Sequence, residues 1–185
     1  MPLTLLQRCG HDSLNQLEAA ARRRYAEATL LLVDQQEPFG AIYLLGYTIE
    51  MRLKAAYLHL IQFPPHDDFM SPQPNAAFSE WKIATNQIKL LLSQPHNAIA
   101  QPQGKHSQPG HNLYGWALLL IDTRAAILPN APFPHGQKIM NLVTDVQLCW
   151  REILRYHAKK PYDEEVKTVQ NAARWFRSHY TQLWS

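Results

Sequence analysis

One helical segment, from Gly40 to Leu60, constrains the fold more than any other part of this chain. At 3.6 residues per turn its large apolar residues form a single seam. A narrow polar stripe, which we expect to face solvent, consists of Thr48, Arg52 and His59. Glu50 and Lys54 belong to neither set, because they lie one turn apart on a face rich in tyrosine. Charge on a half-buried face needs hydrogen-bond partners. We therefore expect Glu50 to be buried and bonded to Lys54 or to a basic residue of a later helix, with Arg155 the best candidate.

The rest of the chain also shows helical periodicity. Ser13 is a suitable N-cap for a first helix that ends before Pro38, since the residue before a proline disfavours helix. Asp163 is a suitable cap for the last helix. No segment alternates with period two for long enough to be a strand. The sequence predicts an all-α, up-and-down bundle of about five helices, at approximately residues 13–37, 38–63, 112–128, 136–157 and 163–183.

Residues 64–110 differ in character from the predicted helices. Seven of the 13 prolines lie in this stretch, together with repeated Gln, Asn and His. Because such a length is unusual for a connection inside a compact domain, we interpret it as an insertion between the second and third helices. We expect it to hold one short helix capped by Ser79, with an exposed loop from Gln101 to Gly110.

The length and composition favour one domain over residues 1–185 and a cytoplasmic location. A hydrophobic fraction of 46% suits a folded protein, and the formal charge of +3 does not by itself demand a nucleic-acid partner. Only two cysteines occur, as is usual in a reducing compartment. The first ten residues lack the features of a signal peptide, and no apolar run is long enough to span a membrane. The sequence contains no recognised metal-binding or cofactor motif. His66-Asp67-Asp68 could suggest a metal site, but it lies in a proline-rich stretch, so we interpret it as a solvated turn.

Three parts of the chain resemble the HEPN family of helical domains. His111-Asn112-Leu113 is similar to the H-D-L that opens one family helix. Trp150 followed by Arg155-Tyr156 is similar to the W…R-Y of the next. The longest match is to the pattern A-x-Y-L-x-G-Y-x-x-E-x-x-L-K-A, whose fixed positions are here Ala41, Tyr43, Leu44, Gly46, Tyr47, Glu50, Leu53, Lys54 and Ala55. The order and rough spacing of the three parts agree with the family over nearly the whole chain.

The resemblance implies a homodimer that forms a cleft and binds a nucleotide or RNA. It also implies a separate nucleotidyltransferase as partner, as in toxin–antitoxin pairs. By the same resemblance the expected ligand-binding residues are Glu50, Lys54, His111, Arg155 and Tyr156. His111 also has a simpler interpretation as a residue at a helix start, and Arg155 as part of an exposed basic face.

Two alternative functions follow from other features. HEPN ribonucleases carry an Arg and a His separated by four to six residues, which in this chain matches Arg151 and His157. A histidine can move a proton while an arginine stabilises phosphate charge. Glu152 stands where the family's active form usually has Asn, which weakens this hypothesis of a metal-independent, toxin-type ribonuclease. The other alternative is a structural partner protein without a ligand.

Overall fold

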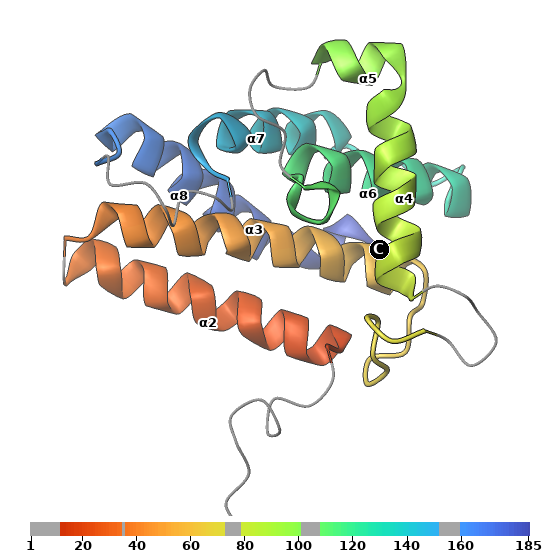
Figure 1. The fold of residues 1–185 in the computed structure, drawn as a ribbon, viewed down its shortest axis with the longest axis horizontal. Helices are drawn as coiled ribbons and strands as arrows, with labels where there is room; N and C mark the ends of the chain where they lie inside the picture. Colours follow the sequence, from red (N-terminus) through yellow and green to blue (C-terminus); the bar gives the residue numbers. More distant parts are fainter. Residues whose placement is uncertain (1–11, 35, 73–78, 101–107, 152–159) are drawn as a thin grey trace, which may run out of the picture.

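The computed structural model describes residues 12–34, 36–72, 79–100, 108–151 and 160–185. Every regular element within these ranges is helical, which confirms the all-α prediction (Figure 1). Two short 3-10 helices are η1 (Pro109–His111) and η3 (Tyr180–Leu183). The α-helices are α2 (Leu14–Val33), α3 (Pro38–Leu60), α4 (Glu80–Ser93), α5 (Pro95–Ala100), α6 (Leu113–Ile127), α7 (Gly136–Cys149) and α8 (Asp163–Ser178). None of these helices is both long and apolar enough to cross a membrane.

Side-chain caps set the starts of three helices. The Ser13 hydroxyl accepts a hydrogen bond from the Gln16 amide at 3.3 Å, and the Ser79 hydroxyl accepts one from the Lys82 amide at 3.4 Å. Both predicted caps are thereby confirmed. The Asn112 side-chain oxygen caps α6 in the same way, since it accepts from the Gly115 amide at 2.8 Å. Each cap satisfies a backbone donor that a helix start otherwise leaves unpaired.

The cap predicted at Asp163 is wrong by one residue. Tyr162 is the N-cap of α8, and its backbone N–H donates to the Glu165 carboxylate at 2.7 Å. Asp163 is the first helical residue instead. Its charge still lies at the positive end of the helix dipole, so the helix begins where the acidic cluster predicted.

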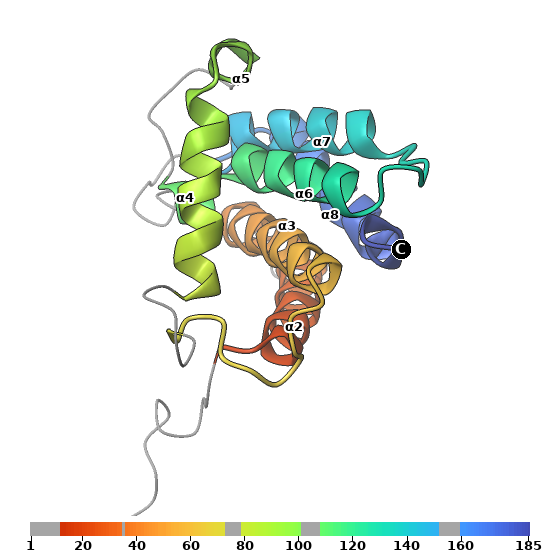
Figure 2. The same ribbon diagram turned by 90° about the vertical axis from the view of Figure 1, so that its right-hand side faces the viewer.

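Helix α3 is the centre of the bundle. It packs against α2, α6 and α8, and the two views show it between α2 on one side and α6 on the other (Figures 1 and 2). Helix α4 runs across this layer, against α6. The main apolar core lies around α3 and includes Leu45, Ile49, Leu53, Leu119, Leu120, Ile139, Trp150 and Phe176.

The expectation that Thr48 and Arg52 face solvent is wrong. Thr48 is 1% exposed and Arg52 is 6% exposed, because α2 and α8 both pack against α3. The Thr48 hydroxyl donates to the Leu44 carbonyl at 3.0 Å, so its burial leaves no donor unpaired. His59, the third residue of the stripe, lies at the end of α3 and keeps 30% of its side chain exposed.

The described part of residues 64–110 contributes to the core, and its interpretation as an insertion stays a prediction. The predicted short helix is present as α4, but Ala84 and Ile88 on it are completely buried and join the main cluster. Gly110, expected in an exposed loop, is buried so close to Trp81 that a β-carbon there would lie 2.6 Å from the ring. Residues 101–107 of the expected loop lie outside the described ranges.

The fourth helix ends earlier than predicted. We expected it to continue to residue 157, but α7 ends at Cys149 and Trp150 has an extended backbone, with φ −134° and ψ 137°. The indole of Trp150 covers Gly46, where any side chain would overlap the ring. The indole N–H donates to the Tyr43 carbonyl at 3.1 Å. This contact with α3 gives Trp150 a position that a continuous helix, predicted from periodicity alone, does not account for.

Candidate functional site

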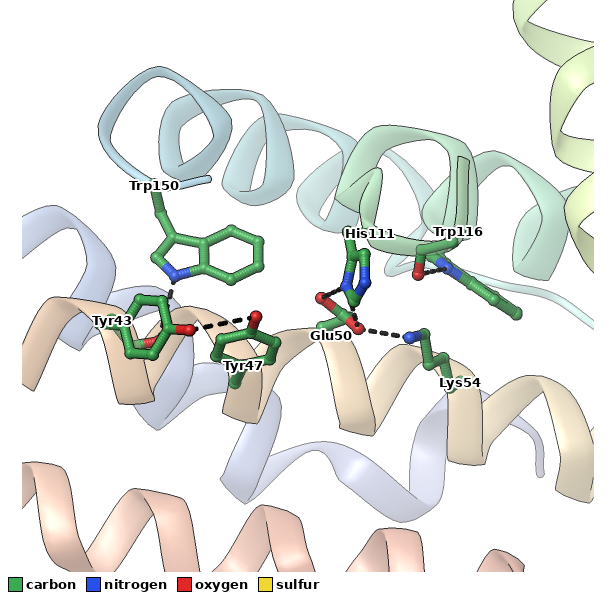
Figure 3. A network of polar contacts seen from close by, with 8 residues as sticks. Tyr43, Tyr47, Glu50, Lys54, His111, Trp116 and Trp150 are labelled. Carbon is green, nitrogen blue, oxygen red and sulfur yellow. Dashed lines mark hydrogen bonds and ion pairs between the residues drawn. The ribbon is translucent and has the colours of Figure 1, made fainter. Parts of the chain in front are cut away.

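Three of the predicted ligand-binding residues meet in one buried cluster of polar groups. Glu50 and Lys54, on successive turns of α3, form an ion pair and are 3% and 5% exposed (Figure 3). His111 reaches the same carboxylate from η1, and its Nδ1 lies 3.1 Å from each carboxylate oxygen. The predicted burial of Glu50 and its bond to Lys54 are therefore confirmed. The second partner is a histidine 61 residues away, whereas the predicted Arg155 lies outside the described residues.

The pKa of Glu50 reports how strongly its surroundings favour the charged form. Burial raises this pKa, but the positive charge of Lys54 and the hydrogen bond from His111 outweigh it, so the pKa lies below its ordinary value. Burial lowers the pKa of Lys54, and the carboxylate of Glu50 opposes that effect. Glu50 is thus a carboxylate at neutral pH, and it compensates the buried cation beside it.

Tryptophan rings enclose the ammonium group of Lys54. Its Nζ lies 4.1 Å from the centre of the Trp81 ring and 5.5 Å from that of Trp116. Trp116 is held in turn by its indole N–H, which donates to the Gly110 carbonyl at 3.1 Å (Figure 3). Cation–π contacts of this kind stabilise a desolvated cation. Glu50 and Lys54 are therefore bonded to one another, and the tryptophan rings hold Lys54 in place. Together the two residues position His111.

His111 is the accessible member of the cluster. One third of its side chain is exposed, at 33%. Because Glu50 is ionised, the nitrogen that faces it, Nδ1, must carry a hydrogen and donate. The other ring nitrogen, Nε2, takes no part in this bond and accepts a hydrogen bond when the ring is neutral or donates one when it is protonated. The cluster therefore fixes the orientation of a histidine whose second nitrogen can serve a ligand.

A pair of tyrosines on α3 extends this site. The Tyr47 ring meets His111 edge to face at 6.2 Å, and Tyr43 meets Tyr47 in the same way at 4.9 Å. The Tyr43 hydroxyl donates to the Tyr47 hydroxyl at 3.3 Å. Trp150 packs against Tyr47 at 5.3 Å and holds the pair from the side of α7 (Figure 3). We call His111, Tyr43 and Tyr47 the histidine–tyrosine face.

The remaining predicted residues are not brought together by the described part of the chain. Arg151 follows the end of α7 and is partly buried. Arg155, Tyr156 and His157 lie outside the described residues, so the pairing of Arg151 with His157 stays a prediction. Sequence reasoning missed the role of Trp81, since its helix was assigned to an insertion. The apolar side of this helix, which includes Trp81 and Ile88, was the signal that α4 joins the core.

The described residues contain no group of three metal-ligating side chains. Asp68 instead accepts hydrogen bonds from the Met70 amide at 2.9 Å and the Ser71 hydroxyl at 2.8 Å. This is bonding found in ordinary polar turns. Comparisons with protein families, with curated proteins and with solved structures find no match to this chain.

Proposed function

We propose that this protein is a binding module for a nucleotide or for single-stranded RNA, and that the histidine–tyrosine face contacts the ligand. The observation that supports the proposal is the geometry of His111, whose Nδ1 donates to a buried carboxylate while a third of the side chain remains exposed. A protonated imidazole binds phosphate oxygen through a charge-assisted hydrogen bond. Neighbouring tyrosine rings are suited to stack with bases.

The HEPN resemblance adds a biological setting to this proposal. In that setting the protein is a cytoplasmic homodimer, its cleft includes the histidine–tyrosine face, and a separate nucleotidyltransferase is its partner. Arg155 and Tyr156 would then act as further ligand contacts beside His111. Glu50 and Lys54 would act by holding His111 and not by touching the ligand.

The test is a binding titration with a fluorescent oligouridylate at low salt, followed by anisotropy. His111→Asn is the informative variant, because the asparagine amide replaces the Nδ1 donor to Glu50 but lacks an equivalent of Nε2. A charge-assisted hydrogen bond contributes about 1.5–3 kcal/mol, so we expect affinity to fall about tenfold or more. His66→Ala is the matched control, since His66 is exposed and its side chain bonds only to Asn15 among described residues.

Three other outcomes would change the proposal. Equal binding by the parent and His111→Asn would exclude the histidine–tyrosine face as the contact surface. Absence of binding by the parent would favour a structural partner protein. Cleavage of the labelled RNA in the presence of a chelator, lost in both Arg151→Ala and His157→Ala while they stay folded, would establish the ribonuclease instead.

A further inference from the structure

A second feature, on another side of α3, is an open groove with a strongly basic lining. It lies between α2, α3 and α8 and has a volume of about 750 Å³. Helices α2 and α8 both pack against α3 (Figures 1 and 2). Four arginines line it, namely Arg22, Arg52, Arg174 and Arg177. Every other lining residue that the structure describes is uncharged. We call this feature the arginine groove.

Arg52 is the residue that distinguishes the arginine groove from an ordinary basic surface. It is 6% exposed, and its Nε is buried without a hydrogen-bond partner. The guanidinium lies over the Tyr180 ring at 4.1 Å, a contact that orients the group and leaves its Nε without a partner. A buried donor without a partner is unfavourable unless something else binds it. Arg52 thus lines the groove with a largely buried guanidinium whose Nε has no partner.

The Glu18 carboxylate interacts electrostatically with Arg52 but does not pair with its Nε. Burial raises the pKa of Glu18, but bonds from His59 and Tyr180 and the charges of His59 and Arg52 outweigh it, so that the pKa is lowered. The Glu18 carboxylate accepts from His59 Nε2 at 3.0 Å and from the Tyr180 hydroxyl at 2.7 Å. Glu18 and Arg52, both in the described part of the chain, form no direct ion pair. Glu18 therefore balances part of the charge of Arg52 from a distance, and the Nε of Arg52 remains unpaired.

The other three arginines of the groove also lack carboxylate partners among the described residues. Arg177 lies over the Tyr25 ring at 4.8 Å, and Arg22 and Arg174 are exposed on α2 and α8. By contrast Arg24, which lies outside the groove, pairs with Glu27 at 2.7 Å. Several like charges that converge without counter-charges create a positive potential that attracts anions.

We propose that the arginine groove is a binding site for a ligand with two or more phosphate groups, supplied by a nucleoside polyphosphate or by the backbone of single-stranded RNA. Arginine forms planar, paired hydrogen bonds with phosphate oxygens, and four arginines line this groove. The groove volume lies within the range of small-molecule sites. This site is independent of the histidine–tyrosine face, because Glu50 and Arg52 project from different sides of α3.

The experiment compares three probes: inorganic triphosphate and adenosine triphosphate by calorimetry, and a fluorescent oligouridylate by anisotropy. Arg174→Gln removes an exposed charge of the groove without disturbing the core, and Arg23→Gln removes one charge from the same helix as Arg22 but outside the groove. We expect Arg174→Gln to weaken binding several-fold. The slope of the logarithm of the binding constant against the logarithm of salt concentration should fall by the amount of about one phosphate contact. Arg23→Gln should bind like the parent.

Arg52→Lys and Arg52→Met test the buried donor. Lysine keeps the charge but not the planar pair of donors, so we expect it to bind less tightly than the parent and more tightly than Arg52→Met. Unfolding curves show whether each variant is folded. If Arg52→Met does not fold, the binding data for Arg174→Gln decide whether the groove binds the probes. Triphosphate binding that Arg174→Gln weakens and His111→Asn does not would assign the phosphate groups to the arginine groove. The reverse pattern would assign them to the histidine–tyrosine face and overturn this proposal.

The probes distinguish the two ligand sources. Binding of triphosphate and nucleotide alone supports a nucleoside polyphosphate, and RNA binding that is weakened by Arg174→Gln supports the RNA backbone. The proposal is overturned if no probe binds, if Arg174→Gln binds every probe as the parent does, or if Arg23→Gln weakens binding as much as Arg174→Gln.

Discussion

Replacement of Glu50 by alanine should be one of the most destabilising single changes in this protein. Glu50 is 3% exposed, and its carboxylate is the bonded partner of both Lys54 and His111. The alanine variant would leave the Lys54 ammonium buried between Trp81 and Trp116 with no counter-charge. An uncompensated buried charge of this kind costs about 3–5 kcal/mol. At about 2–4 °C per kcal/mol for a chain of this size, the melting temperature should fall by roughly 6–20 °C.

A double variant separates the charge effect from the loss of packing. Glu50→Gln/Lys54→Met removes both charges but keeps an amide oxygen as acceptor for His111. Replacement of a buried ion pair by uncharged groups of similar size is often neutral. The double variant should therefore be more stable than Glu50→Ala, and also more stable than Glu50→Gln alone.

Urea unfolding followed by circular dichroism measures these differences. An exposed ion pair contributes at most about 1 kcal/mol, so a cost below about 0.5 kcal/mol for Glu50→Ala would show that the pair behaves as a surface pair. A double variant no more stable than Glu50→Gln would show that the buried charge of Lys54 is not the source of the loss. Either result would refute the reasoning.

Three further predictions concern packing and pH. The added methyl group of Gly46→Ala would overlap the Trp150 indole and should lower the free energy of unfolding by about 1–3 kcal/mol in a urea titration. Gly136→Ala is the control, because its methyl group would make only ordinary van der Waals contact and should not destabilise the protein. The pKa values of Glu18 and Glu50 are lowered by folding, so their contribution to stability is complete above about pH 4.5 and is lost as the pH falls through the folded values; melting temperatures of Glu18→Gln should consequently fall less steeply with acid than those of the parent. Deletion of residues 94–110 should lower the melting temperature, because it removes the buried Gly110, and an unchanged value would support the interpretation of this stretch as a peripheral loop.

Local signals in the sequence were sufficient to find most helix ends. Ser13 and Ser79 were identified because a hydroxyl before an apolar run satisfies an amide of the first turn. The ion pair of Glu50 and Lys54 was predicted for a similar reason, since both residues lie on one helix at a fixed spacing. Features of this kind depend on residues within one turn of each other.

The features that the sequence did not predict depend on contacts between distant residues. A helical wheel assumes one buried face, but α3 is covered from several sides, which buries Thr48 and Arg52 on the face expected to be polar. The end of α7 at Trp150 follows from a fit to Gly46, more than 100 residues earlier. His111 was singled out by resemblance, but nothing near it in the sequence identifies Glu50 as its partner.

The buried charges of α3 differ in a way that bears on function. Glu50 and Lys54 compensate one another and are completed by His111 and by tryptophan rings, so their burial is explained by the fold itself. Arg52 is buried to the same extent, yet its Nε has no partner. The Glu18 carboxylate, which interacts with it electrostatically, is already bonded to His59 and Tyr180. A buried charge that the fold satisfies contributes to a unique structure. In the proposed site the unpaired donor of Arg52 belongs to a groove with three more arginines, so Arg52 is the residue of α3 whose substitution is most informative about ligands.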